Sequence, residues 1–193
     1  LNNRPLMANN ERKPMIVKST NDGRTFEPIS AGMHIARCFY VIGIGTQPSN
    51  NPAFPDREKV MVGWEIPGET IEIEGKQLPR VISNEYTASI GDRANLRRDL
   101  NSWRGRPFTK EELEGFELDD VVGAPCMLNI VHKTKGDKTY ANIASINPMM
   151  KGSTAPAAML DTITYDITDA EIPEMQSVLR ECLDAGAAGL STS

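Results

Sequence analysis

The amino-acid sequence predicts a mainly β domain in which five strands form a small barrel and a helical insert separates the third strand from the fourth. Three observations carry this prediction. Residues 57–66 alternate between apolar and polar side chains, as a half-buried strand does. Residues 95–104 repeat their apolar side chains with a helical period. Residues 125–133 and 138–146 flank a short turn, TKGD, and so predict a hairpin.

The first three strands are assigned to residues 33–45, 57–66 and 80–89. The first of them, MHIARCFYVIGIG, is rich in β-branched and aromatic residues. The loop 46–56 holds three prolines, and loops of this length inside a compact domain are often functional. Trp64 belongs to the apolar face of the second strand, so we expect it in the core. Residues 70–79 are expected to form a short hairpin arm before the third strand.

The helix that follows has two distinct edges. Its apolar side chains fall within a sector about 60° wide, namely Leu96, Leu100 and Trp103. Three arginines fall within an adjacent sector about 40° wide, namely Arg93, Arg97 and Arg104. The apolar edge is predicted to face the core. The basic edge is either an anion-binding surface or a solvated charged face, and both interpretations stay open at this point.

A second short helix begins with an unusually complete signal. The tripeptide Gly-Arg-Pro at 105–107 ends the first helix, because proline prevents its continuation. Thr109 is the predicted N-cap, and Glu112 three residues later completes a capping box. Phe108 is placed to pack onto Leu113. We therefore expect a rigid corner between the two helices that holds two cationic side chains, Arg104 and Arg106.

The remaining elements follow the insert. Residues 118–123 are typical of one helical turn, which leads into the hairpin of the fourth and fifth strands. From residue 149 the composition shifts to small and acidic residues: residues 149–193 carry two basic and seven acidic side chains, out of a net charge of −5 for the chain. Residues 172–183 predict one amphipathic helix in this tail.

The totals suit one domain with tails. A chain of 193 residues with 39% apolar side chains is long enough for one core. We divide it into a flexible N-terminal arm (1–31), the barrel (32–148) and an acidic linker and tail with a helix (149–193). The three cysteines are far apart in the sequence and form no CxxC pair, which favours a reducing compartment. No apolar run is long enough to span a membrane and no signal peptide is present, so we expect a soluble, cytoplasmic protein without membrane contact.

The motifs of common catalytic sites are missing. His34 and His132 lie in predicted strands without metal-ligand spacing to other residues, so both are interpreted as structural. The sequence has no phosphate-binding loop, no GxSxG elbow and no complete dinucleotide fingerprint. The paired acids 111–112 and 119–120 lie at predicted helix starts, where they complement the helix dipole. We therefore predict a protein that is not an enzyme and uses no cofactor or metal.

The predicted order of three strands, a helix and two strands is that of the OB-fold, a five-stranded, partly open barrel. Residues 85–148 also resemble a bacteriophage and prophage family of small OB-fold proteins that are regarded as single-stranded DNA-binding proteins. The most specific motifs are LRRDLNSWRGRPFT (96–109) and KTYANI (138–143). Residues 33–40 and 59–66 extend the likeness, which covers roughly 31–148. It implies single-stranded DNA binding in phage replication or recombination, in the cytoplasm of a bacterial host.

A single-strand binder needs cations for phosphates and aromatic faces for bases. The candidate nucleic-acid-binding residues are Arg37, Phe39, Tyr86, Arg93, Arg97, Arg98, Trp103, Arg104, Arg106, Lys133, Lys135, Lys138 and Tyr140. Besides single-stranded DNA, the expected partners are further copies of the chain and a replication or recombination protein bound through the C-terminal tail. The alternative is a non-catalytic structural or adaptor protein that uses the barrel as a scaffold and the tail for protein contacts. A nuclease on a barrel is a third, less favoured hypothesis, because no acidic metal cluster is apparent.

Overall fold

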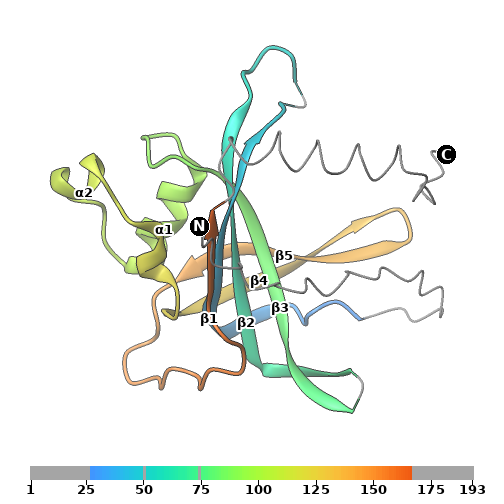
Figure 1. Ribbon diagram of the computed structural model, residues 1–193. Coiled ribbons are helices and arrows are strands. Elements are labelled where there is room, and N and C mark those ends of the chain that lie inside the picture. Colours follow the sequence, from blue (N-terminus) through green and yellow to red (C-terminus); the bar gives the residue numbers. More distant parts are fainter. Residues whose placement is uncertain (1–26, 50, 74, 167–193) are drawn as a thin grey trace, which may run out of the picture.

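The computed structural model describes residues 27–49, 51–73 and 75–166. Five antiparallel strands curl into a half-barrel in the order β3-β2-β1-β4-β5 (Figure 1). Their bounds are β1 Gly32–Gln47, β2 Arg57–Ile73, β3 Lys76–Thr87, β4 Pro125–Lys135 and β5 Lys138–Asn147. A mainly β, barrel-like domain is therefore confirmed. The predicted hairpin arm is confirmed as well, since β2 and β3 pair as far as Ile73 and Lys76.

Strand β1 joins the two halves of the sheet. Its first half pairs with β4 from Gly32 to Arg37, and its second half pairs with β2 from Arg37 onward. The register shifts between Cys38 and Tyr40, which marks a bulge in the middle of the strand. Because a bulge bends a strand and increases its local twist, this irregularity helps the sheet to curl.

The helical insert lies between β3 and β4, as predicted. It consists of α1 Asn95–Arg104, α2 Lys110–Glu114 and a 3-10 turn Leu118–Val121. Strands β3 and β5 end the path of paired strands, and no pairing joins them within the described chain. Helix α1 contacts both of these strands and covers the core between them. Its three predicted apolar side chains are all buried, namely Leu96, Leu100 and Trp103.

The core lies on the concave face of the sheet. Trp64 of β2 is 1% exposed, as expected, and its ring lies 5.8 Å from that of Trp103 between centroids. Trp103 also donates a hydrogen bond from Nε1 to the Pro125 carbonyl oxygen, at 3.0 Å. On the opposite face of β2, Gly63 lies directly under the Tyr40 ring, where a Cβ would come within 2.2 Å of a ring atom. A side chain there would collide with the ring, which explains a glycine in the interior of a strand.

Residues 148–166, here called the strap, return to the sheet. The sequence prediction places them in a linker, but Ile163–Asp166 forms a further strand, β6, that pairs with β1 in parallel. Pairing with β1 starts at Tyr40, just beyond the residues that pair with β4, so β6 occupies the edge that β4 leaves free. The predicted helix 172–183 and residues 1–26 of the N-terminal arm lie outside the described residues.

A buried carboxylate anchors the strap. Glu65, on the outer face of β2, is 0% exposed and forms an ion pair of 2.5 Å with Arg37. Its Oε2 also accepts hydrogen bonds from the backbone N–H groups of Met159 (3.2 Å) and Leu160 (2.8 Å). The Arg37 guanidinium donates a further bond to the Leu160 carbonyl oxygen at 3.2 Å. One buried ion pair thus connects β1, β2 and the strap.

None of the helices in the described ranges is long and apolar enough to cross a membrane.

Glu65→Gln tests this anchor. The variant leaves the buried Arg37 guanidinium without an anion, so we expect the free energy of unfolding to fall by about 3 kcal/mol. Glu85→Gln is the matched control, because the ion pair of Glu85 with Lys59 is partly exposed and contributes less than about 1 kcal/mol. Urea denaturation measures both variants, and hydrogen exchange should show faster exchange of the amides of 159–166 in Glu65→Gln alone. Equal, small effects of the two substitutions would contradict the anchoring role.

Candidate nucleic-acid interface

Three of the aromatic candidates are buried, and two of them, Tyr86 and Trp103, belong to the core. Phe39, Tyr86 and Trp103 are 9%, 4% and 6% exposed. Tyr86 donates a hydrogen bond from its hydroxyl to Asp99 Oδ2 at 3.0 Å, and burial raises the pKa of this hydroxyl well above its ordinary value. These rings pack against the protein itself and offer no free face to a base. Arg37 is likewise engaged, through its ion pair with Glu65.

Most of the helix arginines are paired with carboxylates. Arg97 lies 2.6 Å from Asp92 and Arg98 lies 2.9 Å from Asp99. At the corner between the helices, Glu112 accepts hydrogen bonds from both arginines of that corner, Arg104 and Arg106. Within the described chain, Arg93 is the one candidate arginine without a hydrogen bond or an ion pair. Arg97, Arg98, Arg104 and Arg106 are each paired with a carboxylate of the chain. These contacts fit a charged surface whose charges are neutralised within the protein better than an open anion site.

The Glu112 carboxylate completes the capping box of α2 and also binds two arginines. The predicted capping box is confirmed, because the Thr109 hydroxyl accepts a bond from the Glu112 N–H and the Glu112 carboxylate accepts one from the Thr109 N–H. The same carboxylate binds the two corner arginines. Hydrogen bonds from Arg106, and then from the Thr109 backbone, lower the pKa of Glu112 to about 2. A fixed negative charge therefore lies at the centre of the corner.

The aromatic rings beside this corner pack against each other. Phe108 packs edge-on against Phe116, with 5.0 Å between ring centroids, whereas its predicted partner Leu113 is 36% exposed. The guanidinium of Arg104 lies over both rings, 4.5 Å from the centroid of Phe108 and 5.4 Å from that of Phe116. Cation–π contact and the ion pair together keep Arg104 within the protein.

The β4–β5 hairpin brings the remaining candidates together. In the ladder Lys133 lies opposite Tyr140 and Lys135 lies opposite Lys138. Directly opposed residues share a face of the sheet, and so do residues two apart along a strand. The four side chains therefore form one exposed surface, which we call the hairpin face. None of its three lysines has a carboxylate partner within the part of the chain that the structure describes, and the Tyr140 side chain is 49% exposed.

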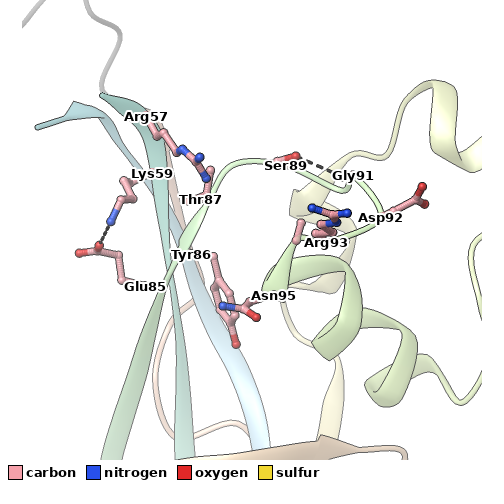
Figure 2. Close-up of a pocket in the computed structure, with 11 residues that line it drawn as sticks. Arg57, Lys59, Glu85, Tyr86, Thr87, Ser89, Gly91, Asp92, Arg93 and Asn95 are labelled. Atoms are coloured by element: carbon pink, nitrogen blue, oxygen red, sulfur yellow. Dashed lines mark hydrogen bonds and ion pairs between the residues drawn. The ribbon is translucent and has the colours of Figure 1, made fainter. Parts of the chain in front are cut away.

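A second surface contains the candidate residues Tyr86 and Arg93, but its other lining residues were not predicted as part of a site. A hollow of about 780 Å³ lies between the paired strands β2 and β3 and the connection from β3 to α1 (Figure 2). Its lining includes the side chains of Arg57, Lys59, Thr87 and Arg93. A neighbouring hollow of about 300 Å³ shares the first three of these residues and reaches Phe54 in the β1–β2 loop. We call the two hollows together the β2–α1 groove.

The groove retains two uncompensated positive charges. Lys59 is paired with Glu85 at 2.5 Å, and Asp92 is paired with Arg97. The side chains of Arg57 and Arg93 make neither a hydrogen bond nor an ion pair with any residue placed by the structure. Arg57 lies 6.0 Å from the ring centroid of Phe54, which is 55% exposed. The sequence signals for this surface were the long loop 46–56 and the candidate residue Arg93, but no periodic pattern connects β2 to the start of α1.

No family model, curated protein or solved structure matches this chain. Across the ranges that the structure describes, no three His, Cys, Asp or Glu side chains gather in a way that could hold a metal ion. His34 and His132 each bond a backbone carbonyl oxygen through Nε2, that of Ser30 and that of Ile29.

Acid titration tests the double role of Glu112. Because its pKa in the folded state lies below its ordinary value of 4.5, the ionised form stabilises the fold above that pH, and this contribution is lost as the pH falls toward 2. The difference in unfolding free energy between wild type and Glu112→Gln should be constant above about pH 5 and shrink between pH 4.5 and 2. In Arg106→Ala the pKa of Glu112, followed by NMR, should rise toward its ordinary value. A difference between wild type and Glu112→Gln that does not change with pH would contradict this.

Proposed function

We propose that this chain is a non-enzymatic, OB-fold single-stranded DNA-binding protein of phage replication or recombination, which needs no cofactor. The half-barrel supports the proposal, because its strands and helical insert follow one another in the order of OB-folds, which commonly bind oligonucleotides. The open side between β3 and β5 fits the partly open character of that barrel.

The observation that carries the proposal is the hairpin face. Its lysines are exposed and have no carboxylate partner among the described residues, so their charges are available to an external anion. Tyr140 lies directly opposite Lys133. Every nucleotide of a single strand carries a phosphate, which a lysine can bind, and a base, which can stack on a tyrosine ring.

The contrast with the helix arginines sharpens this interpretation. Binding DNA through Arg97, Arg98, Arg104 or Arg106 would require each guanidinium to exchange a protein carboxylate for a phosphate. That exchange gains little, because one anion replaces another and the displaced carboxylate loses its partner. Lysines without a partner lose only water and counterions, and release of counterions favours binding. We therefore assign the DNA contact to the hairpin face and leave those four arginines out of it.

Self-association and a replication or recombination partner for residues 149–193 belong to the same proposal. An adaptor function is the second candidate, and the exposed strand β6 favours it, because Ile163 and Tyr165 are 48% and 56% exposed at the sheet edge. Ile163→Ser combined with Tyr165→Ser removes both exposed apolar side chains of β6 and leaves the hairpin face unchanged. Loss of partner-protein binding in this variant would favour the adaptor function, whereas oligonucleotide binding equal to that of wild type would favour the DNA-binding function.

Binding of a fluorescent single-stranded oligonucleotide, measured by anisotropy at two salt concentrations, tests the proposal. Combined Lys133→Ala, Lys135→Ala and Lys138→Ala should reduce the slope of log affinity against log salt by about 2, since each phosphate contact contributes about 0.7 on a single strand. Tyr140→Ala should weaken binding by about 1–3 kcal/mol.

The control for this experiment removes the same charge elsewhere. It combines Lys76→Ala, Lys110→Ala and Lys151→Ala, three exposed lysines outside the hairpin face. We expect the control to bind DNA almost as wild type does. If the two triple variants lose affinity equally, DNA is attracted by the overall charge of the protein, and the hairpin face is not a defined interface. If the wild-type protein does not bind the oligonucleotide, the proposed function is wrong.

A further inference from the structure

We infer that the β2–α1 groove is a nucleotide subsite, which holds a phosphate between Arg57 and Arg93 and a base against Phe54. This inference rests on the proposed function and adds a second, separate contact surface to it. The groove involves β2, β3, the β1–β2 loop and the connection to α1, whereas the hairpin face belongs to β4 and β5.

The charged side chains of the groove favour an anionic ligand. Two arginines, one lysine and two acids line the larger hollow. The lysine and both acids already form ion pairs. Lys59 pairs with Glu85, and Asp92 pairs with Arg97, which does not line the hollow. Figure 2 shows the dashed contact between Lys59 and Glu85, and it shows Asp92 pointing away from the hollow. Two guanidinium groups without an anion remain, one on β2 and one before α1, so the hollow favours an anionic ligand.

Arg57 and Arg93 come from different parts of the chain but line the same hollow. Arg57 starts β2, next to the end of β3 at Thr87, whereas Arg93 belongs to the connection that leads away from β3. In Figure 2 they lie on two sides of the same space. Guanidinium groups bind phosphate oxygens in a planar, two-pronged geometry, and a phosphate between the two walls would receive donors from both.

Size and an aromatic neighbour identify the class of ligand. A hollow of about 780 Å³ lies in the range of sites for whole organic ligands and far exceeds a phosphate ion. It shares Arg57, Lys59 and Thr87 with the smaller hollow lined by Phe54, whose side chain is 55% exposed in a loop. A ligand that fills both hollows has an anionic group and a flat group, which is the composition of a nucleotide. Arg57, beside the Phe54 ring, lines both parts.

The test uses three probes on the wild-type protein: a single-stranded thymidine oligonucleotide, thymidine monophosphate and inorganic phosphate. Amide chemical shifts report which of them occupies the groove. The oligonucleotide should shift signals near residues 54–59 and 87–95 at far lower concentration than the other two. If thymidine monophosphate occupies the groove as tightly as the oligonucleotide does, the ligand is a free nucleotide and the subsite for a strand is overturned.

Substitutions then quantify the contribution to strand binding. Arg57→Ala combined with Arg93→Ala should weaken oligonucleotide binding about 10- to 100-fold and reduce the salt slope by about 0.7, the contribution of the one phosphate held between them. Phe54→Ala should weaken it about 5- to 150-fold without changing that slope. Lys76→Ala combined with Lys151→Ala is the matched control, because it removes two exposed charges far from the groove in the sequence. We expect this control to bind like wild type.

The outcomes separate this inference from the proposed function. If wild type binds the oligonucleotide and the groove variants bind it equally well, the groove is not part of the interface, although DNA binding stands. If wild type does not bind the oligonucleotide, both proposals fail. Circular dichroism of each variant should match wild type, because all three substituted side chains are exposed. If the Arg57→Ala and Arg93→Ala double variant unfolds, Arg57→Gln combined with Arg93→Gln takes its place, and we expect the same loss of affinity.

Discussion

The half-barrel depends on the packing of α1 against the open side of the sheet. Strands β3 and β5 do not pair in the described chain, so the concave apolar face would be open to water between them. Leu96, Leu100 and Trp103 fill that gap, and the tilted contact of Trp103 with Trp64 connects the helix to the centre of β2. Burial of such side chains contributes about 1.5–3 kcal/mol each. The position of this helix also determines where the groove is found, because the connection into α1 forms one of its walls.

Charge compensation divides the surface into two kinds of region. Around the helices, arginines and carboxylates alternate within reach of one another, and Glu112 alone serves a capping box and two guanidinium groups. The three lysines of the β4–β5 hairpin face, and Arg57 and Arg93 in the β2–α1 groove, lie without carboxylate partners in the described chain. An external anion gains most where no internal anion must first be displaced. The distribution of partners, more than the density of arginines, therefore indicates where an anionic polymer would bind.

The strap adds a second constraint to the sheet. A carboxylate on the outer face of a strand is normally solvated, yet Glu65 is completely buried, because the strap covers it. Its pairing with Arg37 and with two backbone N–H groups satisfies the charge in place of water. Downstream of this contact, β6 continues along the edge of β1. The outer face of the β1–β2 pair is thus partly covered by the chain itself.

The sequence by itself determined the features that depend on neighbours along the chain. The period of residues 95–104 identified the buried edge of α1, the spacing of Thr109 and Glu112 identified a helix start, and the TKGD turn identified the β4–β5 hairpin. The same hairpin register brought Lys133, Lys135, Lys138 and Tyr140 together, because facing residues follow directly from a short turn. These are local relations, and a pattern of a few residues is enough to specify them.

Only the tertiary structure decided which charged and aromatic side chains remain open. Phe39, Tyr86 and Tyr140 are all aromatic residues of predicted strands, but Tyr86 is buried in the core and Phe39 is buried beside the Tyr40 ring, whereas Tyr140 is 49% exposed. Arg37 meets its anion 28 residues away, and the strap returns from more than 90 residues beyond Glu65. Arg57 and Arg93 line one hollow although no sequence period relates them. Burial and pairing arise from contacts between distant segments, and an ion pair or a groove exists only once the chain has brought those segments together.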